Sequence, residues 1–218
     1  MSESERVAGE ARWPMAAAVA TAIVLTVLAP DPVRLGPRWL LASLEGVLLV
    51  ALVAGDPGRI DRRSRVLRLL SIGLVSALVV GALAATVRLT VELIRGGPVS
   101  NSPTSLLEAG SIVWTSNIIA FALLYWELDG GGSAARTHGA PRYPDLAFPQ
   151  QTSPHLAPPG WRPRFVDYLY LGFTNATAFS PTDTMPLAAW AKMAMTVQSV
   201  ISLVVLGLVV ARAVNVFM

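Results

Sequence analysis

The sequence predicts an all-α fold: a polytopic integral membrane protein with about five full transmembrane helices and one further short membrane segment. Three observations indicate this class. Hydrophobic residues make up 53% of the 218 positions, and the mean hydropathy is +0.54. Charged residues make up only 14%, whereas soluble domains carry about 25%. The apolar residues also form long runs, each close to the roughly 20 residues that cross a bilayer.

Five apolar runs are read as helices, and turn signals of proline and glycine separate them. The predicted helices cover about Trp13 to Ala29, Trp39 to Ala54, Ser64 to Ile94, Ser105 to Trp126 and Leu187 to Val214. A short, partly polar segment, Phe165 to Ser180, precedes the last helix and is expected to be either re-entrant or a sixth span. The chain therefore divides into an N-terminal four-helix membrane region (1–127), a Pro/Gly-rich extramembrane loop (128–164), and the short segment with the final transmembrane helix (165–218).

A cluster of arginines lies between the second and third helices: Arg59, Arg62, Arg63, Arg65 and Arg68. Four of them are three residues apart, as in a voltage-sensor helix, but the charges stop where the apolar run begins. This pattern is typical of a cytoplasmic anchor, because basic loops stay inside. The N-terminus and the 128–164 loop are then inside as well, and so is the C-terminus if Phe165–Ser180 crosses fully. Because nearly all basic residues are arginine, we expect a multi-pass protein of the bacterial plasma (inner) membrane.

Two charged residues fall inside predicted helices, Glu45 in the second and Arg88 in the third. A charge at membrane depth is costly unless it is paired, and it marks a functional site by default. On the expected topology both residues lie toward the outer side, so an ion pair between them is geometrically allowed. Two interpretations stay open: a pair that fixes helix packing, and a relay for protons or ions.

Several classes of function are disfavoured by what the sequence lacks. There are no cysteines, which excludes disulfides and thiolate metal sites, and His138 and His155 stand alone without ligand spacing. No phosphate loop, nucleophile elbow or paired His/Glu motif occurs. The pI is about 9.8, but arginines at the ends of apolar runs indicate membrane anchors rather than nucleic-acid binding. We expect no metal, no cofactor, no nucleic-acid partner and no enzymatic activity.

The stretch from Asp167 to Pro186, followed by a long apolar helix, is the most informative part of the chain. It resembles the pore region of two-helix potassium channels, in which a short aromatic pore helix leads into Thr-Val-Gly-Tyr-Gly-Asp, a proline and the inner helix. Aligned without gaps, Phe173, Thr177, Asp183 and Pro186 fall on the family's Phe, Thr, Asp and Pro. The resemblance covers residues 165–214. The same arrangement also resembles a family of uncharacterised bacterial multi-span membrane proteins.

The resemblance implies that a filter-like segment follows the pore helix, and here that segment is degenerate. It comprises Thr177, Ala178, Phe179, Ser180, Pro181, Thr182, Asp183 and Thr184. A potassium filter is built from rings of backbone carbonyls, and the family uses glycines for the backbone freedom that this requires. This chain has Ser180 and Thr182 in their place, and Pro181 has a fixed φ and no N–H. We therefore expect a weakly selective cation pathway rather than potassium selectivity.

Orientation is a second departure from the family, because a channel pore loop enters from outside while the arginine cluster places the 128–164 loop inside. Two functions follow from the sequence. The first is an ion-channel-like protein, a homotetramer in membrane lipid that conducts monovalent ions. The alternative is a small bacterial membrane transporter or structural membrane protein of unknown substrate. Oligomeric state separates them, since a channel of this kind needs four copies around an axis.

Overall fold

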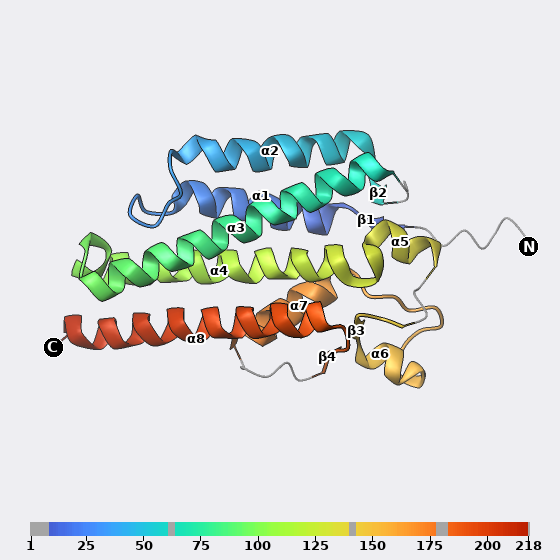
Figure 1. Cartoon of the computed structure of the whole chain (residues 1–218). Helices are drawn as coiled ribbons and strands as arrows, with labels where there is room; N and C mark the ends of the chain where they lie inside the picture. Colours follow the sequence, from blue (N-terminus) through green and yellow to red (C-terminus); the bar gives the residue numbers. More distant parts are fainter. Residues whose placement is uncertain (1–8, 61–63, 140–142, 178–182, 218) are drawn as a thin grey trace, which may run out of the picture.

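The computed structural model describes residues 9–60, 64–139, 143–177 and 183–217, and its core is a bundle of long antiparallel helices (Figure 1). The principal helices are α1 (Trp13–Leu28), α2 (Arg38–Gly55), α3 (Arg65–Arg95), α4 (Pro103–Leu128), α7 (Phe165–Thr177) and α8 (Ala189–Phe217). These bounds confirm the predicted helices to within a few residues. Local chemistry explains several ends: Pro14 and Pro103 stand at the first turns of α1 and α4, and α3 ends on Gly96 in the left-handed conformation.

Short elements connect the long helices at the two ends of the bundle. They are η2 (Pro98–Asn101), η3 (Asp129–Gly131), α5 (Ser133–His138), α6 (Pro149–Thr152) and η4 (Pro154–Leu156). Two antiparallel strand pairs accompany them: β1 (Glu10–Ala11) with β2 (Arg59–Ile60), and β3 (Leu146–Ala147) with β4 (Met185–Pro186). We call the end that holds both strand pairs the arginine end, because β2 begins at Arg59 and α3 begins at Arg65. The opposite end holds the 29–37 connection and η2 (Figure 1).

Helix α4 is the centre of the bundle. Figure 1 shows α1, α2 and α3 on one side of it and α7 and α8 on the other. The α4 side chains from Asn117 to Leu123 are all buried. One apolar cluster fills the arginine half of the bundle around Leu74, Tyr125 and Tyr168. A second cluster, around Leu89 and Leu106, fills the half toward the opposite end.

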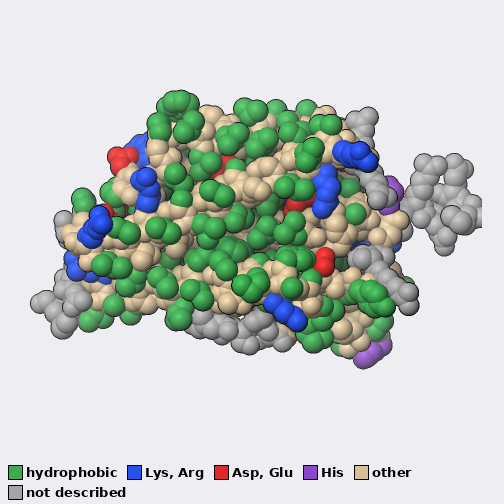
Figure 2. Space-filling model, in the orientation of Figure 1, with side chains coloured by type: hydrophobic (Ala, Val, Ile, Leu, Met, Phe, Trp, Pro, Cys, Tyr) green, Lys and Arg blue, Asp and Glu red, His purple; other side chains and the backbone are tan. Residues whose placement is uncertain are grey.

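The outer surface of the bundle is apolar, as a membrane-spanning protein requires. Four helices are long and apolar enough to cross a bilayer: α2, α3, α4 and α8. Helix α1 is apolar but has only 16 residues, about 24 Å at 1.5 Å per residue. Large hydrophobic side chains remain exposed along the long helices, for example Val47, Leu69 and Val210. Figure 2 shows these side chains covering the middle of the visible face, with charged side chains mainly toward its two ends.

Helix α7 does not cross the bundle. It enters from the arginine end, and Figure 1 shows it lying alongside about half the length of α8. The return of the chain to that end is fixed by β3–β4 pairing, with Leu146 opposite Pro186, and by the Leu187 N–H, which donates to the Asp145 carbonyl at 2.8 Å. Helices α7 and α8 thus begin at the same end of the bundle, and this arrangement favours the re-entrant alternative over a full span of Phe165–Ser180. Figure 1 shows the two ends of the chain at opposite ends of the bundle. The sequence placed both on the same side only if Phe165–Ser180 crossed fully.

Candidate functional site

Helix α7 lies in a close-fitting groove between α4 and α8. Its point of nearest approach is Gly172, where an added Cβ would lie 3.1 Å from the Ile118 carbonyl oxygen and 3.3 Å from the Ala122 Cβ. One residue further on, the Phe173 ring packs against Trp114 with ring centroids 6.1 Å apart. Trp114 is close to the midpoint of α4 (Pro103–Leu128). The C-terminal end of α7 therefore reaches the middle depth of the membrane-spanning bundle.

A buried set of polar side chains, which we call the Gln198 clamp, fixes this half-length helix. Gln198 of α8 is fully buried, and its Nε2 donates to the Gly172 carbonyl at 2.8 Å. Its Oε1 accepts from Tyr125 Oη of α4 at 2.7 Å and from Asn175 Nδ2 of α7 at 2.8 Å. Asn175 Nδ2 also donates to the Met195 carbonyl at 3.0 Å. One amide side chain thus joins three helices at membrane depth, where buried polar groups need hydrogen-bond partners.

The N-terminal end of α7 is held by carboxylates at the arginine end. Glu10, in β1, accepts a hydrogen bond from the backbone N–H of Phe165, the first residue of α7. The same carboxylate accepts from Trp126 Nε1 at 2.9 Å and from Ser133 Oγ at 3.1 Å. A carboxylate at this position satisfies a free helix N–H and complements the positive end of the helix dipole. The entry point of α7 is therefore fixed to β1, α4 and α5.

The 128–164 segment is ordered where it adjoins α4 and α7. Asp129 Oδ2 accepts from Tyr168 Oη at 2.5 Å, and its Oδ1 accepts from the Leu146 N–H at 3.2 Å. Arg136 Nη1 donates to the carbonyls of Trp126 and Asp129, and its guanidinium lies 5.1 Å from the centre of the Tyr168 ring. These contacts connect the end of α4 to the start of β3 and to α7, so the loop forms a cap on the arginine end.

The filter-like residues are only partly described. Ala178, Phe179, Ser180, Pro181 and Thr182 lie outside the described residues. The sequence predicts a sharp turn at Ser180–Thr182, because Pro181 breaks the aromatic-rich apolar run, and this prediction therefore falls outside the described residues as well. Thr177 is exposed at the mid-depth end of α7, which ends three residues before the predicted Ser180. Asp183 is exposed and Thr184 is buried, just before β4. The described part of the segment thus places a hydroxyl at the deep end of α7.

The arginine cluster lies at the end of the bundle from which α7 enters. Arg59 Nη1 donates to the Gly9 carbonyl at 3.3 Å, beside the β1–β2 pair. Arg65 begins α3, and Arg68 Nη1 lies 3.8 Å from Glu127 Oε1. Arg62 and Arg63 are outside the described residues. No described arginine of the cluster continues into the middle of α3, which fits the anchor interpretation better than a voltage sensor.

Glu45 and Arg88 do not contact one another in the described structure. Arg88 Nη1 donates instead to the Arg34 carbonyl at 2.8 Å, which joins α3 to the 29–37 connection. Glu45 is 1% exposed, and its Oε2 has no hydrogen-bond partner. Glu45 lines a small cavity together with the polar residues Thr26, Arg34 and Ser116. The ion pair expected from the sequence is therefore not formed between these two residues.

This arrangement predicts that Glu45→Leu raises the free energy of unfolding by about 1 kcal/mol, because a buried carboxylate oxygen without a partner is costly. Glu92→Leu in α3 is the matched control. It should lower stability, because Glu92 Oε1 accepts from the Val99 N–H at 3.2 Å. Unfolding of the purified protein in detergent, followed by tryptophan fluorescence, measures both. A loss of stability in Glu45→Leu would show that Glu45 has a partner, as a pair with Arg88 requires.

No protein-family model, curated protein or solved structure matches this chain. The Gln198 clamp is the part of the site for which sequence reasoning assigned no role. Its signal was present in the sequence: Gln198 is an amide inside the longest apolar run, and Asn175 is an amide inside the short segment. Amides at membrane depth require partners, so the two residues were candidates for one another. Spacing alone did not identify Tyr125, which lies 73 residues before Gln198.

Proposed function

We propose that the chain is an ion-channel-like protein of the bacterial plasma membrane in which α4, α7 and α8 form the unit that lines a weakly selective cation pathway. The observation that carries this proposal is α7 itself: a 13-residue helix that ends at mid-depth and from which the chain returns to its end of entry. Half-length helices of this kind line binding sites and pores in membrane proteins. The order of long helix, half helix and long helix matches the resemblance to two-helix channels.

The electrostatics of α7 support cations as the permeant species. A helix carries about half a negative charge at its C-terminal end, and α7 places that end at the middle of the bundle, next to the exposed Thr177. A membrane interior offers little water to screen this charge, so a cation is favoured there. Asp183, six residues on and exposed, adds a full negative charge to the same segment.

An oligomer is part of the proposal, because α7 has one unpartnered face in a single chain. Val166, Tyr170 and Phe173 are 61%, 56% and 48% exposed along it. Where a chain leaves a helix at membrane depth, its backbone groups need protein or water as partners rather than lipid. Four copies around an axis would place this face at the centre. The proposed pathway takes a carboxylate from the exposed Asp183, and the sequence adds the hydroxyls of Ser180 and Thr182 to the same segment.

The proposed orientation follows from charge. The arginine end carries the 59–68 cluster together with Arg12, Arg136, Arg162 and Arg164, whereas the opposite end carries Arg34, Arg38, Arg95 and Arg212. Basic residues concentrate in cytoplasmic loops, which puts the arginine end inside and the C-terminus outside if α1 crosses as the fifth span. Helix α7 then enters from the cytoplasm, the reverse of a potassium channel.

Ion flux into liposomes tests this function. We expect the purified wild-type protein to pass potassium and sodium at similar rates and chloride much more slowly, since the segment lacks the filter glycines. Asp183→Asn should lower cation flux several-fold, while Asp167→Asn, in the first turn of α7, serves as a matched carboxylate control. Strong potassium preference would contradict the filter argument, and absence of flux for every ion would contradict the channel proposal.

A transporter that works within one chain is the second candidate, and Glu45 is the observation that favours it. This carboxylate is buried in the first half of α2 with one oxygen unpartnered, as in membrane proteins that carry protons or ions. Oligomeric state decides between the two. Native mass spectrometry that finds only monomers would favour the transporter, and tetramers would favour the channel.

A further inference from the structure

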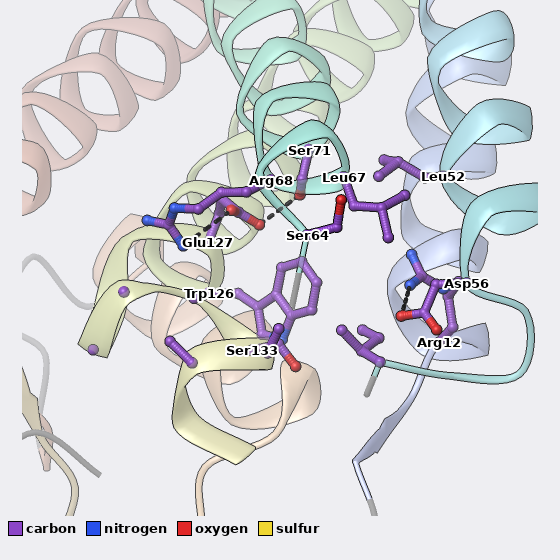
Figure 3. Close-up of a pocket in the computed structure, with 16 residues that line it drawn as sticks. Arg12, Leu52, Asp56, Ser64, Leu67, Arg68, Ser71, Trp126, Glu127 and Ser133 are labelled. Atoms are coloured by element: carbon purple, nitrogen blue, oxygen red, sulfur yellow. Dashed lines mark hydrogen bonds and ion pairs between the residues drawn. The ribbon is translucent and has the colours of Figure 1, made fainter. Parts of the chain in front are cut away.

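A cavity of about 480 Å³ lies at the arginine end, on the side of α4 away from α8. Its walls come from α2, β2, α3, the end of α4 and the start of α5. Figure 3 shows Glu127, Ser71 and Arg68 on one side, the Arg12–Asp56 ion pair on the other, and Trp126 between them. The volume is in the range of small-molecule sites, roughly 300–1,000 Å³. This cavity is separate from α7 and the filter-like residues.

Glu127 is the residue in this cavity that lacks a sufficient partner. It is 5% exposed, and its Oε2 accepts from Ser71 Oγ at 2.5 Å. Its Oε1 has Arg68 Nη1 as the nearest cation, at 3.8 Å, which is too long for a hydrogen bond. The Arg68 side chain is 43% exposed, so solvent weakens this ion pair. The buried Arg136 also acts on this carboxylate, but its Nη1 donates to the Trp126 and Asp129 carbonyls. The carboxylate therefore has room for a cation that lies closer than either arginine.

The position of Glu127 in the helix strengthens the need for a cation. It is in the last turn of α4, a 26-residue helix that ends at Leu128. The C-terminal end of a helix favours cations and disfavours carboxylates. The negative charge of Glu127 adds to that of the helix end, whose Trp126 carbonyl already accepts a hydrogen bond from Arg136.

Three consecutive glycines keep the carboxylate accessible. Gly130, Gly131 and Gly132 all have positive φ, at 57°, 82° and 95°, a conformation that other residues rarely adopt. A Cβ on Gly132 would lie 2.7 Å from Arg68 Nη1 and 3.4 Å from Glu127 Oε1. A side chain at this position would occupy the space beside the carboxylate. The turn thus passes Glu127 without covering it.

The other residues that line the cavity indicate which chemical groups a ligand would carry besides its cation. Leu52, Ile60 and Leu67 provide apolar surface, and the Trp126 indole is held in place by its hydrogen bond to Glu10. An indole ring attracts cations and apolar groups. Arg12 and Asp56 neutralise one another at 2.9 Å. The cavity therefore offers one under-neutralised carboxylate above an aromatic and aliphatic surface.

We propose that this cavity binds a small organic amine, whose ammonium group binds Glu127 and whose apolar body packs against Trp126 and Leu67. The ammonium donates to Oε1 and displaces the exposed Arg68 side chain into solvent. A neutral molecule of the same shape lacks this interaction. The site opens at the arginine end, so the amine comes from the cytoplasm in the proposed orientation.

The test is binding of butylamine, benzylamine and 2-phenylethylamine to purified full-length protein in detergent, each compared with the alcohol of the same shape. Titration calorimetry and the shift of the thermal unfolding midpoint both report binding. We expect at least one amine to bind saturably and at least about tenfold more tightly than its alcohol, as a charge-assisted hydrogen bond requires. Glu127→Gln, which can still accept from Ser71, should abolish this preference. Glu108→Gln, at an exposed position near the start of the same helix, should leave it unchanged.

A second variant keeps the proposal testable if Glu127→Gln does not fold. Ser64 also lines the cavity, between the Glu127 side and the Arg12–Asp56 pair (Figure 3), and makes no side-chain cap hydrogen bond to α3, so Ser64→Trp fills the cavity without removing a contact of Glu127. It should weaken amine binding at least about tenfold, because it occupies the apolar half of the site. Amines that bind no better than alcohols, or that bind equally to Ser64→Trp, would overturn the proposal, as would no binding of any amine. None of these readouts depends on ion flux.

Discussion

Gln198→Leu is expected to lower the free energy of unfolding by about 3 kcal/mol, because three buried hydrogen bonds between helices are lost and each contributes about 1 kcal/mol. They join Gln198 to the Tyr125 hydroxyl, the Asn175 amide and the Gly172 carbonyl. Leucine has a similar volume, so the change removes hydrogen bonds rather than packing. Denaturant or thermal unfolding in detergent measures the loss.

Ser202→Ala is the matched control for Gln198→Leu. Ser202 lies one turn further along α8, is 1% exposed, and its Oγ has no hydrogen-bond partner. Removing this hydroxyl should leave stability unchanged or raise it slightly, because an unpartnered buried hydroxyl contributes no hydrogen bond. If Gln198→Leu and Ser202→Ala lower the free energy of unfolding equally, α8 tolerates no change at this depth. That result would contradict a specific role for the Gln198 clamp.

Gly172→Val is expected to lower the free energy of unfolding by about 3 kcal/mol, at the upper end of the cost of overpacking a closely fitted site. The added Cβ meets the Ile118 carbonyl oxygen at 3.1 Å, and that oxygen belongs to the α4 backbone and cannot rotate away. Helix α7 must then move away from α4. This movement also strains the hydrogen bond that Gln198 Nε2 donates to the Gly172 carbonyl. Thermal unfolding in detergent measures the effect, and the channel proposal adds a loss of flux.

Gly207→Val provides the comparison on α8. A Cβ at Gly207 meets no other atom within 4 Å, so the same change there should be close to neutral or slightly stabilising, since valine is a better helix former than glycine. If both variants lose the same stability, the close approach of α7 to α4 is not what Gly172 provides.

Most helices of this fold were predictable because the signals are local. A run such as Leu187 to Val214 is apolar throughout, and breaks such as Pro30-Asp31-Pro32 and Gly96-Gly97-Pro98 mark the ends of helices. The short length and polar content of Phe165–Ser180 also indicated a re-entrant segment. The return of the chain to the arginine end was not decided by these signals, because it depends on pairing between Leu146 and Pro186 across 40 residues.

The polar contacts of the site were harder to predict, since they join residues distant in sequence. The cost of burying Glu45 and Arg88 suggested that they pair, but Arg88 reaches the Arg34 carbonyl instead. The rotation of α2 about its axis, which places Glu45 in one cavity with Thr26 and Ser116, is set by packing rather than by sequence spacing. Gln198 was visible as an unusual residue, yet its three partners come from two other helices. Such sets become evident only when the helices are placed together.

Cysteine labelling on the two sides of the membrane tests the central claim, that α7 enters and returns at one end. The chain has no native cysteine, so Thr152→Cys, Leu187→Cys and Leu35→Cys each introduce a single reporter at an exposed position. With a membrane-impermeant maleimide on right-side-out and inside-out vesicles, we predict that positions 152 and 187 react from the same side, the cytoplasmic one, and position 35 from the other. Reaction of position 187 from the side of position 35, opposite to position 152, would mean that residues 165–180 cross the membrane, and would contradict this account.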